Sequence, residues 1–219
     1  MHVAELWRYP VKSMAGERLE VAEVRADGIT GDRLVQVVDT RGHVVTSRTR
    51  PRLLGLRGTV APEGGALVNG QPWTSPEVAR AVQAAAGDGA RLVQGEGLER
   101  FDVLPLLVAT DGAIAALGVD GRRLRPNLVI GGVEGLAERS WPGRLLRVGD
   151  VVVAVASLRS RCVMTTFDPD NQTQDISVLH RIVREFGGRM ALDCQVVRGG
   201  RIALGDPVEV LEPVGKNGQ

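Results

Sequence analysis

Cys162 is the residue of this chain whose type and setting are best suited to chemistry. It is one of two cysteines in 219 residues, and it follows Arg159 and Arg161 at the end of an apolar, β-prone run. A turn rich in proline, aspartate and asparagine comes next. Nearby positive charge favours the thiolate, which is the form of cysteine that binds metals and attacks electrophiles. A small buried hydrophobic residue is the alternative, and the local pattern alone leaves both open.

The composition is that of an ordinary folded protein without a strongly charged partner. Apolar residues make up 43% of the chain, charged residues 24%, and the formal net charge at pH 7 is +1. This balance gives no reason to expect binding to nucleic acid or to a membrane. Two cysteines are too few for a disulfide framework or for a four-thiolate iron–sulfur cluster, so neither is expected. Because the apolar runs are short and the N-terminus has no signal-peptide pattern, we expect a cytoplasmic location.

Short strands dominate the hydrophobic pattern. We expect strands at 3–9, 19–24, 34–39, 44–47, 53–60, 66–68, 71–73, 91–94, 104–109, 127–130, 148–158, 191–198 and 208–211. We expect helices at 76–86, between Ser75 as cap and Gly87, at 111–117, as a single turn at 134–139, and at 176–186, between Asp175 as cap and Gly187. Many short strands with few helices predict a mainly antiparallel barrel or sandwich with its helices on the outside.

Several separated motifs resemble those of the MOSC proteins, the superfamily named for the molybdenum-cofactor sulfurase C-terminal domain. Residues 159–170 resemble the cofactor loop of the amidoxime-reducing-component branch in their Ser-Arg-Cys, Thr-Thr and Asp-Pro-Asp order. The other matching motifs follow in the family's order: Tyr9-Pro10-Val11-Lys12-Ser13, Gly31-Asp32-Arg33, Val45-Thr46-Ser47-Arg48 with Pro51-Arg52-Leu53, Arg125-Pro126-Asn127 and Glu138-x-x-Trp141. The resemblance implies a mainly β, β-barrel-like MOSC fold with a few peripheral α-helices. It places an N-terminal β-barrel part at 1–90, the MOSC domain at 91–213 and a flexible tail at 214–219.

The resemblance also implies which residues hold a cofactor. Cys162 is similar to the cysteine whose sulfur binds molybdenum in this branch, and it is the expected metal ligand and catalytic residue. The pterin and its phosphate would be held by Lys12, Ser13, Arg33, Arg125, Ser160 and Arg161, with Arg48, Asn127 and Thr165 as second-tier candidates. A thiolate suits a redox metal, and arginine suits a phosphate. Taken singly, Lys12 and Arg33 resemble ordinary surface charges, and Asp168 and Asp170 are as readily explained as turn formers as catalytic acids.

The function implied by the resemblance is that of a molybdenum-cofactor oxidoreductase acting on small N-hydroxylated compounds. Its electrons would come from a separate ferredoxin-, flavoprotein- or cytochrome-type protein, since the C-terminal ferredoxin domain of some bacterial relatives has no counterpart in this sequence. The same residues would equally serve a non-catalytic carrier that delivers the cofactor or its sulfur. Pyridoxal phosphate belongs to a separate aminotransferase-like part of multidomain sulfurases and is not expected here.

One segment departs from the family pattern. Relatives often carry an aromatic–glycine element followed by Asn or Tyr near the cofactor, whereas this chain has Ala191-Leu192-Asp193-Cys194. The alignment places Cys194 at the Asn/Tyr position, which would alter substrate specificity. The alternative is a buried strand cysteine.

Overall fold

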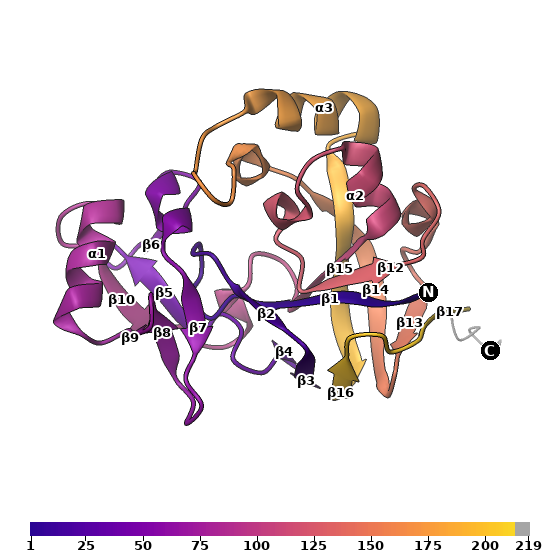
Figure 1. Cartoon of the computed structure of the whole chain (residues 1–219), viewed down its shortest axis with the longest axis horizontal. Coiled ribbons are helices and arrows are strands. Elements are labelled where there is room, and N and C mark those ends of the chain that lie inside the picture. The colour runs from indigo at the N-terminus through magenta and orange to yellow at the C-terminus, as the bar shows by residue number, and fades with distance from the viewer. Residues whose placement is uncertain (213–219) are drawn as a thin grey trace, which may run out of the picture.

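A large mixed sheet organises the computed structural model, which describes residues 1–212 (Figure 1). In sheet order its eight strands within that range are β17 (Val208–Leu211), β13 (Leu145–Val148), β14 (Val151–Ser160), β15 (Arg189–Arg198), β11 (Leu106–Thr110), β12 (Leu128–Gly131), β1 (His2–Arg8) and β2 (Glu17–Leu19). Strands β11 and β12 are parallel, and the other neighbours are antiparallel. The first strand of the chain therefore lies inside the sheet of the C-terminal half. The tail expected at 214–219 lies outside the described residues.

Smaller antiparallel sheets complete the β structure. One joins β10 (Arg91–Gln94), β5 (Val35–Val38) and β6 (Val44–Val45). A second joins β16 (Gly200–Ala203), β3 (Val21–Arg25) and β4 (Gly28–Ile29), and a third joins β7 (Gly58–Val60), β8 (Ala66–Val68) and β9 (Gln71–Pro72). The sheets containing β5 and β8 lie with α1 on one side of the molecule (Figure 1). The prediction of a mainly β fold is confirmed.

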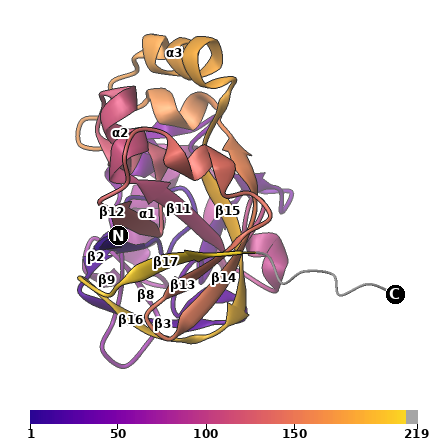
Figure 2. The same ribbon diagram turned by 90° about the vertical axis from the view of Figure 1, so that its right-hand side faces the viewer.

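The helices lie on the outside of these sheets, as the sequence predicts (Figure 1). They are α1 (Pro76–Ala86), α2 (Asp111–Leu117) and α3 (Ile176–Phe186). Ser75 caps α1 and Asp175 caps α3, because each side chain accepts a backbone N–H of the first turn. Helices α2 and α3 lie together at one end of the large sheet in both views (Figure 1 and Figure 2). None of the helices in the described range has the length and apolar character needed to span a bilayer.

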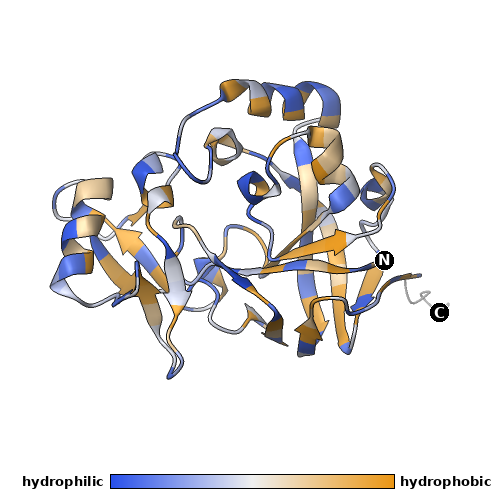
Figure 3. Ribbon diagram, in the orientation of Figure 1, coloured by the Kyte–Doolittle hydropathy of each residue, from blue (hydrophilic) through white to orange (hydrophobic). Residues whose placement is uncertain are grey.

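Three apolar clusters fill the interior of the described part. The largest lies within the main sheet, and Leu6, Ile130 and Leu146 are among its fully buried members. A second packs α1 against the sheet of β5, and a third packs α2 and α3 against the other face of the main sheet. In the hydropathy colouring the strands are rich in apolar residues, and apolar and polar residues alternate along the ribbon of α3 (Figure 3). The core around α1 and the sheet of β5 is thus separate from the core of the main sheet, and residues from both parts of the chain line the candidate site.

Three predicted strands are wrong in detail, and one of them, 148–158, is interrupted by a turn at 149–150 between β13 and β14. Within 53–60 only β7 is extended, because Pro51–Gly55 forms a 3₁₀ helix, η1, that buries the adjacent residues Leu53 and Leu54. Proline fixes φ near the helical value at the start of such a turn, and two consecutive buried residues do not fit a half-buried strand. The predicted strand 19–24 is divided at Glu20 into β2 and β3, which belong to different sheets. The helical turn expected at 134–139 is a 3₁₀ helix, η4, at Ala137–Ser140.

Candidate functional site

Cys162 lies where β14 leaves the main sheet. The pairing of β14 with β15 shifts register repeatedly, and one of these shifts falls between Leu158 and Ser160. Such irregularities bend a strand and redirect its side chains. Beyond Ser160 the chain forms the 3₁₀ helix η5 (Val163–Thr166), with Cys162 at its N-cap. The carbonyl of Cys162 accepts the Thr165 N–H at 3.1 Å and the Thr165 hydroxyl at 2.9 Å. These bonds fix the backbone and leave the Cys162 thiol half-buried at the wall of a cleft.

This cleft lies between the two halves of the chain and gathers most of the predicted site residues. Its empty volume is about 690 Å³, including space open to solvent. The predicted residues that line it are Lys12, Ser13, Arg33, Arg48, Arg125, Ser160, Arg161 and Cys162. The lining residues that the sequence did not assign include Thr46, Asp102, Leu124, Arg159 and Met164. We call it the cationic cleft.

Positive charge dominates the cationic cleft. Within the described range, its lining contains one lysine and five arginines but a single carboxylate, Asp102. Asp102 lies 3.1 Å from Lys12 Nζ and 3.0 Å from Arg48 Nη2. Burial raises the pKa of Asp102, but Lys12 and Arg48 outweigh this effect and hold it below the ordinary value. The carboxylate therefore stays ionised and ties together two cations, while the remaining positive charge is available to an anionic ligand.

Arg161 is a deeply buried cation of the cleft, as is Arg125. Its Nη2 donates a hydrogen bond to the carbonyl of Leu124 at 2.7 Å, whereas its Nε, although buried, has no hydrogen-bond partner in the described part of the chain. Burial, reinforced by Arg159, lowers the pKa of Arg161 to about 10. A buried donor without an acceptor is unfavourable, so the cleft is suited to a ligand that brings one. A phosphate oxygen meets that requirement.

Arg159 and Asp193 form an ion pair beside Arg161. Arg159 Nε lies 2.8 Å from Asp193 Oδ1, and both side chains are largely buried. Burial raises the pKa of Asp193, and the two arginines act against this. The sequence did carry a signal for Arg159, because residues two apart on a strand share a face and Arg161 was assigned. Nothing in the sequence connected Asp193 with this pair.

Cys194 lies on the same strand but outside the cleft. It is fully buried in the largest apolar cluster, opposite Leu106 and Val155 of the neighbouring strands. Burial raises the pKa of its thiol well above the ordinary value. The structure therefore agrees with the alternative of a buried strand cysteine, and Asp193 is the residue of this segment that reaches the arginines of the cleft.

A buried carboxylate, Asp32, organises the wall behind the cationic cleft. It accepts the backbone N–H of Tyr9 at 2.6 Å, accepts Asn127 Nδ2 at 3.1 Å, and pairs with the guanidinium of Arg33. Asn127 also accepts the N–H of Leu107. Asn127 therefore supports the wall and does not line the cleft, and Thr165, which is buried under the Cys162 turn, does not line it either. Motif residues of similar polarity thus divide into some that face the cleft and some that hold it in place.

Three residues of the cleft have a left-handed backbone without being glycine. The φ angles are 72° at Ser13, 50° at Arg33 and 55° at Arg125. Such a conformation costs on the order of 1–2 kcal/mol for a residue with a Cβ, and it persists where surrounding contacts impose it. Arg125 lies 4.3 Å and Arg33 5.1 Å from the centre of the buried Tyr9 ring, in cation–π contact. The side chains of the cleft are therefore set by constrained backbone as well as by their own contacts.

Another motif residue, Glu138, is separate from the cleft. Its carboxyl is buried beside Thr110, whose hydroxyl donates to it at 3.4 Å, and burial raises its pKa. Trp141 is buried in the main core. This motif therefore contributes to packing near the start of α2.

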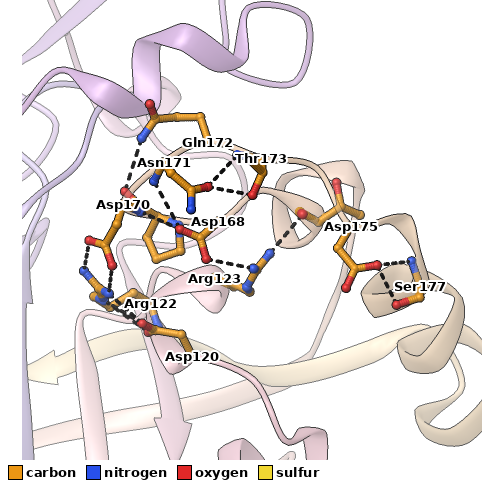
Figure 4. Close-up of polar contacts among 12 residues, drawn as sticks. Asp120, Arg122, Arg123, Asp168, Asp170, Asn171, Gln172, Thr173, Asp175 and Ser177 are labelled. Carbon is orange, nitrogen blue, oxygen red and sulfur yellow. Dashed lines mark hydrogen bonds and ion pairs between the residues drawn. The ribbon is translucent and has the colours of Figure 1, made fainter.

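The loop after Cys162 is held by two consecutive arginines of the 3₁₀ helix η3 (Gly121–Leu124) (Figure 4). Arg122 bridges Asp170 and Asp120. Arg123 donates to the carbonyl of Thr166 at 2.9 Å and to Asp168 Oδ2 at 3.1 Å. Asp168 also accepts the backbone N–H groups of the two residues after Pro169. These contacts identify Asp168 and Asp170 as turn-forming and anchoring residues.

The replacement of Arg123 by alanine is expected to loosen this loop. Arg123 is largely buried, and hydrogen bonds from a charged group contribute about 1.5–3 kcal/mol each. We therefore expect faster amide hydrogen exchange over residues 166–175 and a free energy of unfolding lower by about 2 kcal/mol. The control is Arg144→Ala, which removes a more exposed ion pair with Glu212 and is expected to leave exchange in the loop unchanged. Equal exchange in wild type and Arg123→Ala would contradict the anchoring role.

Comparisons with known proteins show which proteins this chain resembles. Residues 1–104 match the MOSC N-terminal beta barrel domain, and residues 109–209 match the MOSC domain. Mitochondrial amidoxime reducing component 2 of Macaca fascicularis is 29% identical to this chain over 231 residues, covering 79% of the chain and 68% of that protein. Mitochondrial amidoxime-reducing component 1 of Homo sapiens is 27% identical over 282 residues, covering 95% of the chain and 82% of that protein.

A solved structure has a similar fold. The YUAD protein from Bacillus subtilis superposes with a TM-score of 0.53 at 14% identity, covering 96% of this chain and 94% of that one. This likeness concerns the fold, whereas the matches of both domains, which follow one another along nearly the whole sequence, identify the family. The chain belongs to the MOSC family and combines an N-terminal MOSC β-barrel domain with a MOSC domain.

Proposed function

We propose that this chain is a molybdenum-cofactor-dependent oxidoreductase that reduces small N-hydroxylated compounds. The observation that carries the proposal is the cationic cleft, in which a half-buried thiol lies beside a surplus of fixed positive charge and a buried, unpartnered arginine donor. Relatives that align with most of the chain are named amidoxime-reducing components. The overall reaction would be R–NHOH + 2 e⁻ + 2 H⁺ → R–NH₂ + H₂O.

The residues of the cleft fit a pterin cofactor that bears a phosphate and a metal. Cys162 would bind molybdenum through Sγ, a soft ligand for a redox metal. The pterin and its phosphate would be held by Lys12, Ser13, Arg33, Arg48, Arg125, Arg159, Ser160 and Arg161. Asn127 and Thr165 would support the wall of the cleft. Asn127 would do so through its hydrogen bond to Asp32, and Thr165 through its hydrogen bond to the Cys162 carbonyl. When bound, the cofactor supplies the two-electron redox chemistry, and the protein supplies binding and orientation.

The fixed charges of the cleft have separate tasks in this proposal. The Arg161 Nε would donate to a phosphate oxygen, which gives this buried group the acceptor that residues 1–212 do not provide. Asp102 would hold Lys12 and Arg48 in place through its two ion pairs. Arg48 also faces Cys162 across the cleft.

The proposal extends to the partners and the location. Electrons would come from a separate ferredoxin-, flavoprotein- or cytochrome-type protein. A cytoplasmic location belongs to the proposal as well, while the names of the relatives place those proteins in mitochondria.

The test is multiple turnover by the purified protein. The chain is produced in a host that makes the molybdenum cofactor, and benzamidoxime is supplied with reduced methyl viologen as artificial donor. We expect many molecules of benzamidine per chain, and none from protein made in a host that lacks the cofactor. At most one product molecule per chain, with transfer of the cofactor to a cofactor-free acceptor enzyme, would instead establish the non-catalytic carrier.

A further inference from the structure

A second cavity lies beside the cationic cleft. Its empty volume is about 880 Å³, including space open to solvent. Arg125 and Met164 line both spaces, so these two side chains separate them. The rest of its lining comes from both halves of the chain, including η1 on one side and η3 on the other. Motif residues such as Tyr9 and Phe167 line this cavity, but the proposed cofactor site gives the cavity itself no role.

The partition between the two spaces is fixed by specific contacts. Met164 Sδ accepts a hydrogen bond from the buried hydroxyl of Ser47 at 3.0 Å. Arg125 stacks on Tyr9 and donates to the carbonyl of Met14 at 2.8 Å. Met164 follows Cys162 by two residues on the turn of η5. A molecule in the second cavity would therefore lie next to the turn that carries the cysteine.

The wall of the second cavity is aromatic. Trp7, Tyr9 and Phe167 all contribute to its lining, in a chain in which aromatic residues make up only 3%. Tyr9 and Phe167 are buried and Trp7 is half-buried, so the rings are fixed before a ligand arrives. Aromatic rings stack against other planar rings with a preference beyond their buried area. The cavity is therefore suited to a flat aromatic molecule.

Its charge is positive, and its four arginines differ in their partners: Arg125 has the Met14 carbonyl and the Tyr9 ring described above. Arg122 and Arg123 are paired with aspartates of the loop and of η3. The guanidinium of Arg57, by contrast, is exposed and forms neither an ion pair nor a hydrogen bond with any residue from 1 to 212. An arginine of this kind can bind a carboxylate through two parallel hydrogen bonds. An anionic group on the ligand would give Arg57 its partner.

We infer that the second cavity holds the body of the substrate, and that this substrate is a planar aromatic compound with an anionic group. The inference rests on the proposed function, which supplies the reacting group of the substrate. The N-hydroxyl end of the substrate would point past Met164 towards Cys162. The aromatic body would lie against Trp7 and Phe167, with its anionic group at Arg57. The binding step itself requires neither molybdenum nor electrons, so it can be measured apart from the reaction.

Isothermal titration calorimetry with 2-naphthoate tests this inference on the full chain. We expect binding by the wild type that is at least fivefold tighter than binding of the neutral naphthalene-2-methanol. Arg57→Gln should weaken 2-naphthoate binding about tenfold, as expected for one charge-assisted contact. The matched control is Arg41→Gln, an exposed arginine on the β5–β6 turn, which should bind as the wild type does. Trp7→Leu and Phe167→Leu, checked for folding by circular dichroism, should both weaken binding.

The alternative position for the probe is the cationic cleft. If Arg48→Gln weakens 2-naphthoate binding while Arg57→Gln does not, the anion binds in the cleft and the inference is overturned. Absence of binding to the folded wild type overturns it too. Because the probe has no N-hydroxyl group, these results are independent of turnover. Binding with the expected mutational pattern but no benzamidoxime reduction would leave this cavity assigned and refute the proposed function.

Discussion

Cys162→Ala is expected to remove both molybdenum and reductase activity while leaving the fold intact. The thiol is half-buried at the cleft wall, and the backbone of its turn is held by Thr165 and not by the sulfur. Outer contacts around a metal ligand already contribute 10–100-fold to metal affinity or activity, so loss of the ligand should cost more than about 100-fold. Elemental analysis of protein from a cofactor-competent host measures the metal, and benzamidoxime turnover measures the activity. The free energy of unfolding should change by less than about 0.5 kcal/mol.

Cys194→Ala is the matched control for this variant. Cys194 is buried in the main core, so its loss should lower the free energy of unfolding by about 1 kcal/mol and leave molybdenum per chain unchanged. Cys162→Ala should therefore lower molybdenum content and activity, whereas Cys194→Ala should lower only the free energy of unfolding. A Cys162→Ala protein that retained molybdenum and turnover would refute the assignment of Cys162.

Asp32→Ala should have the largest effect on stability. The carboxylate is 1% exposed and connects Arg33, the backbone of Tyr9 and Asn127. Its removal leaves a largely buried guanidinium without its partner, which typically costs about 3–5 kcal/mol. Urea denaturation should show a correspondingly lower midpoint. Because Arg33 lines the cationic cleft, molybdenum per chain should fall as well.

Two further variants test whether the burial of Asp32 is the cause of the expected loss of stability. Asp32→Asn keeps an oxygen that can accept the Tyr9 N–H, so its free energy of unfolding should lie between those of the wild type and Asp32→Ala. Glu77→Ala removes an exposed carboxylate that pairs with Arg80 on α1, and no measurable change is expected. If Asp32→Ala and Glu77→Ala behaved alike, the buried network would not be holding this wall together.

Local signals in the sequence located many element boundaries but not the way the elements pair. Asn69-Gly70 forms the turn between β8 and β9, with both residues at positive φ, and Gly187 follows α3 in the left-handed conformation. These features depend on a few neighbouring residues. The insertion of β1 beside β12, and the parallel pairing of β11 with β12, depend on contacts over more than a hundred positions or on a crossover. A single sequence does not encode such pairings in any short pattern.

The motifs located the cleft but did not distinguish residues that face it from residues that support it. Lys12, Arg48 and Cys162 face the space, whereas Asn127 and Thr165 hold its walls. Polarity and spacing are the same in both groups, and only the tertiary structure decides the direction of a side chain. Asp102 was missed because it follows a glycine-rich stretch without a recognisable pattern. The second cavity was missed because its wall combines residues from distant segments.

The left-handed backbone conformations of Ser13, Arg33 and Arg125 limit how this site could be transferred to another protein. Glycine adopts such conformations most readily, but glycine would remove the hydroxyl and guanidinium groups that the cleft presents. A host scaffold given only the side chains would let the backbone relax to ordinary angles and turn those groups away. A transplanted site would therefore have to include these three left-handed residues together with Tyr9, Asp32 and Asn127. For the same reason, a change beneath the cleft can redirect a cation without altering any residue that lines it.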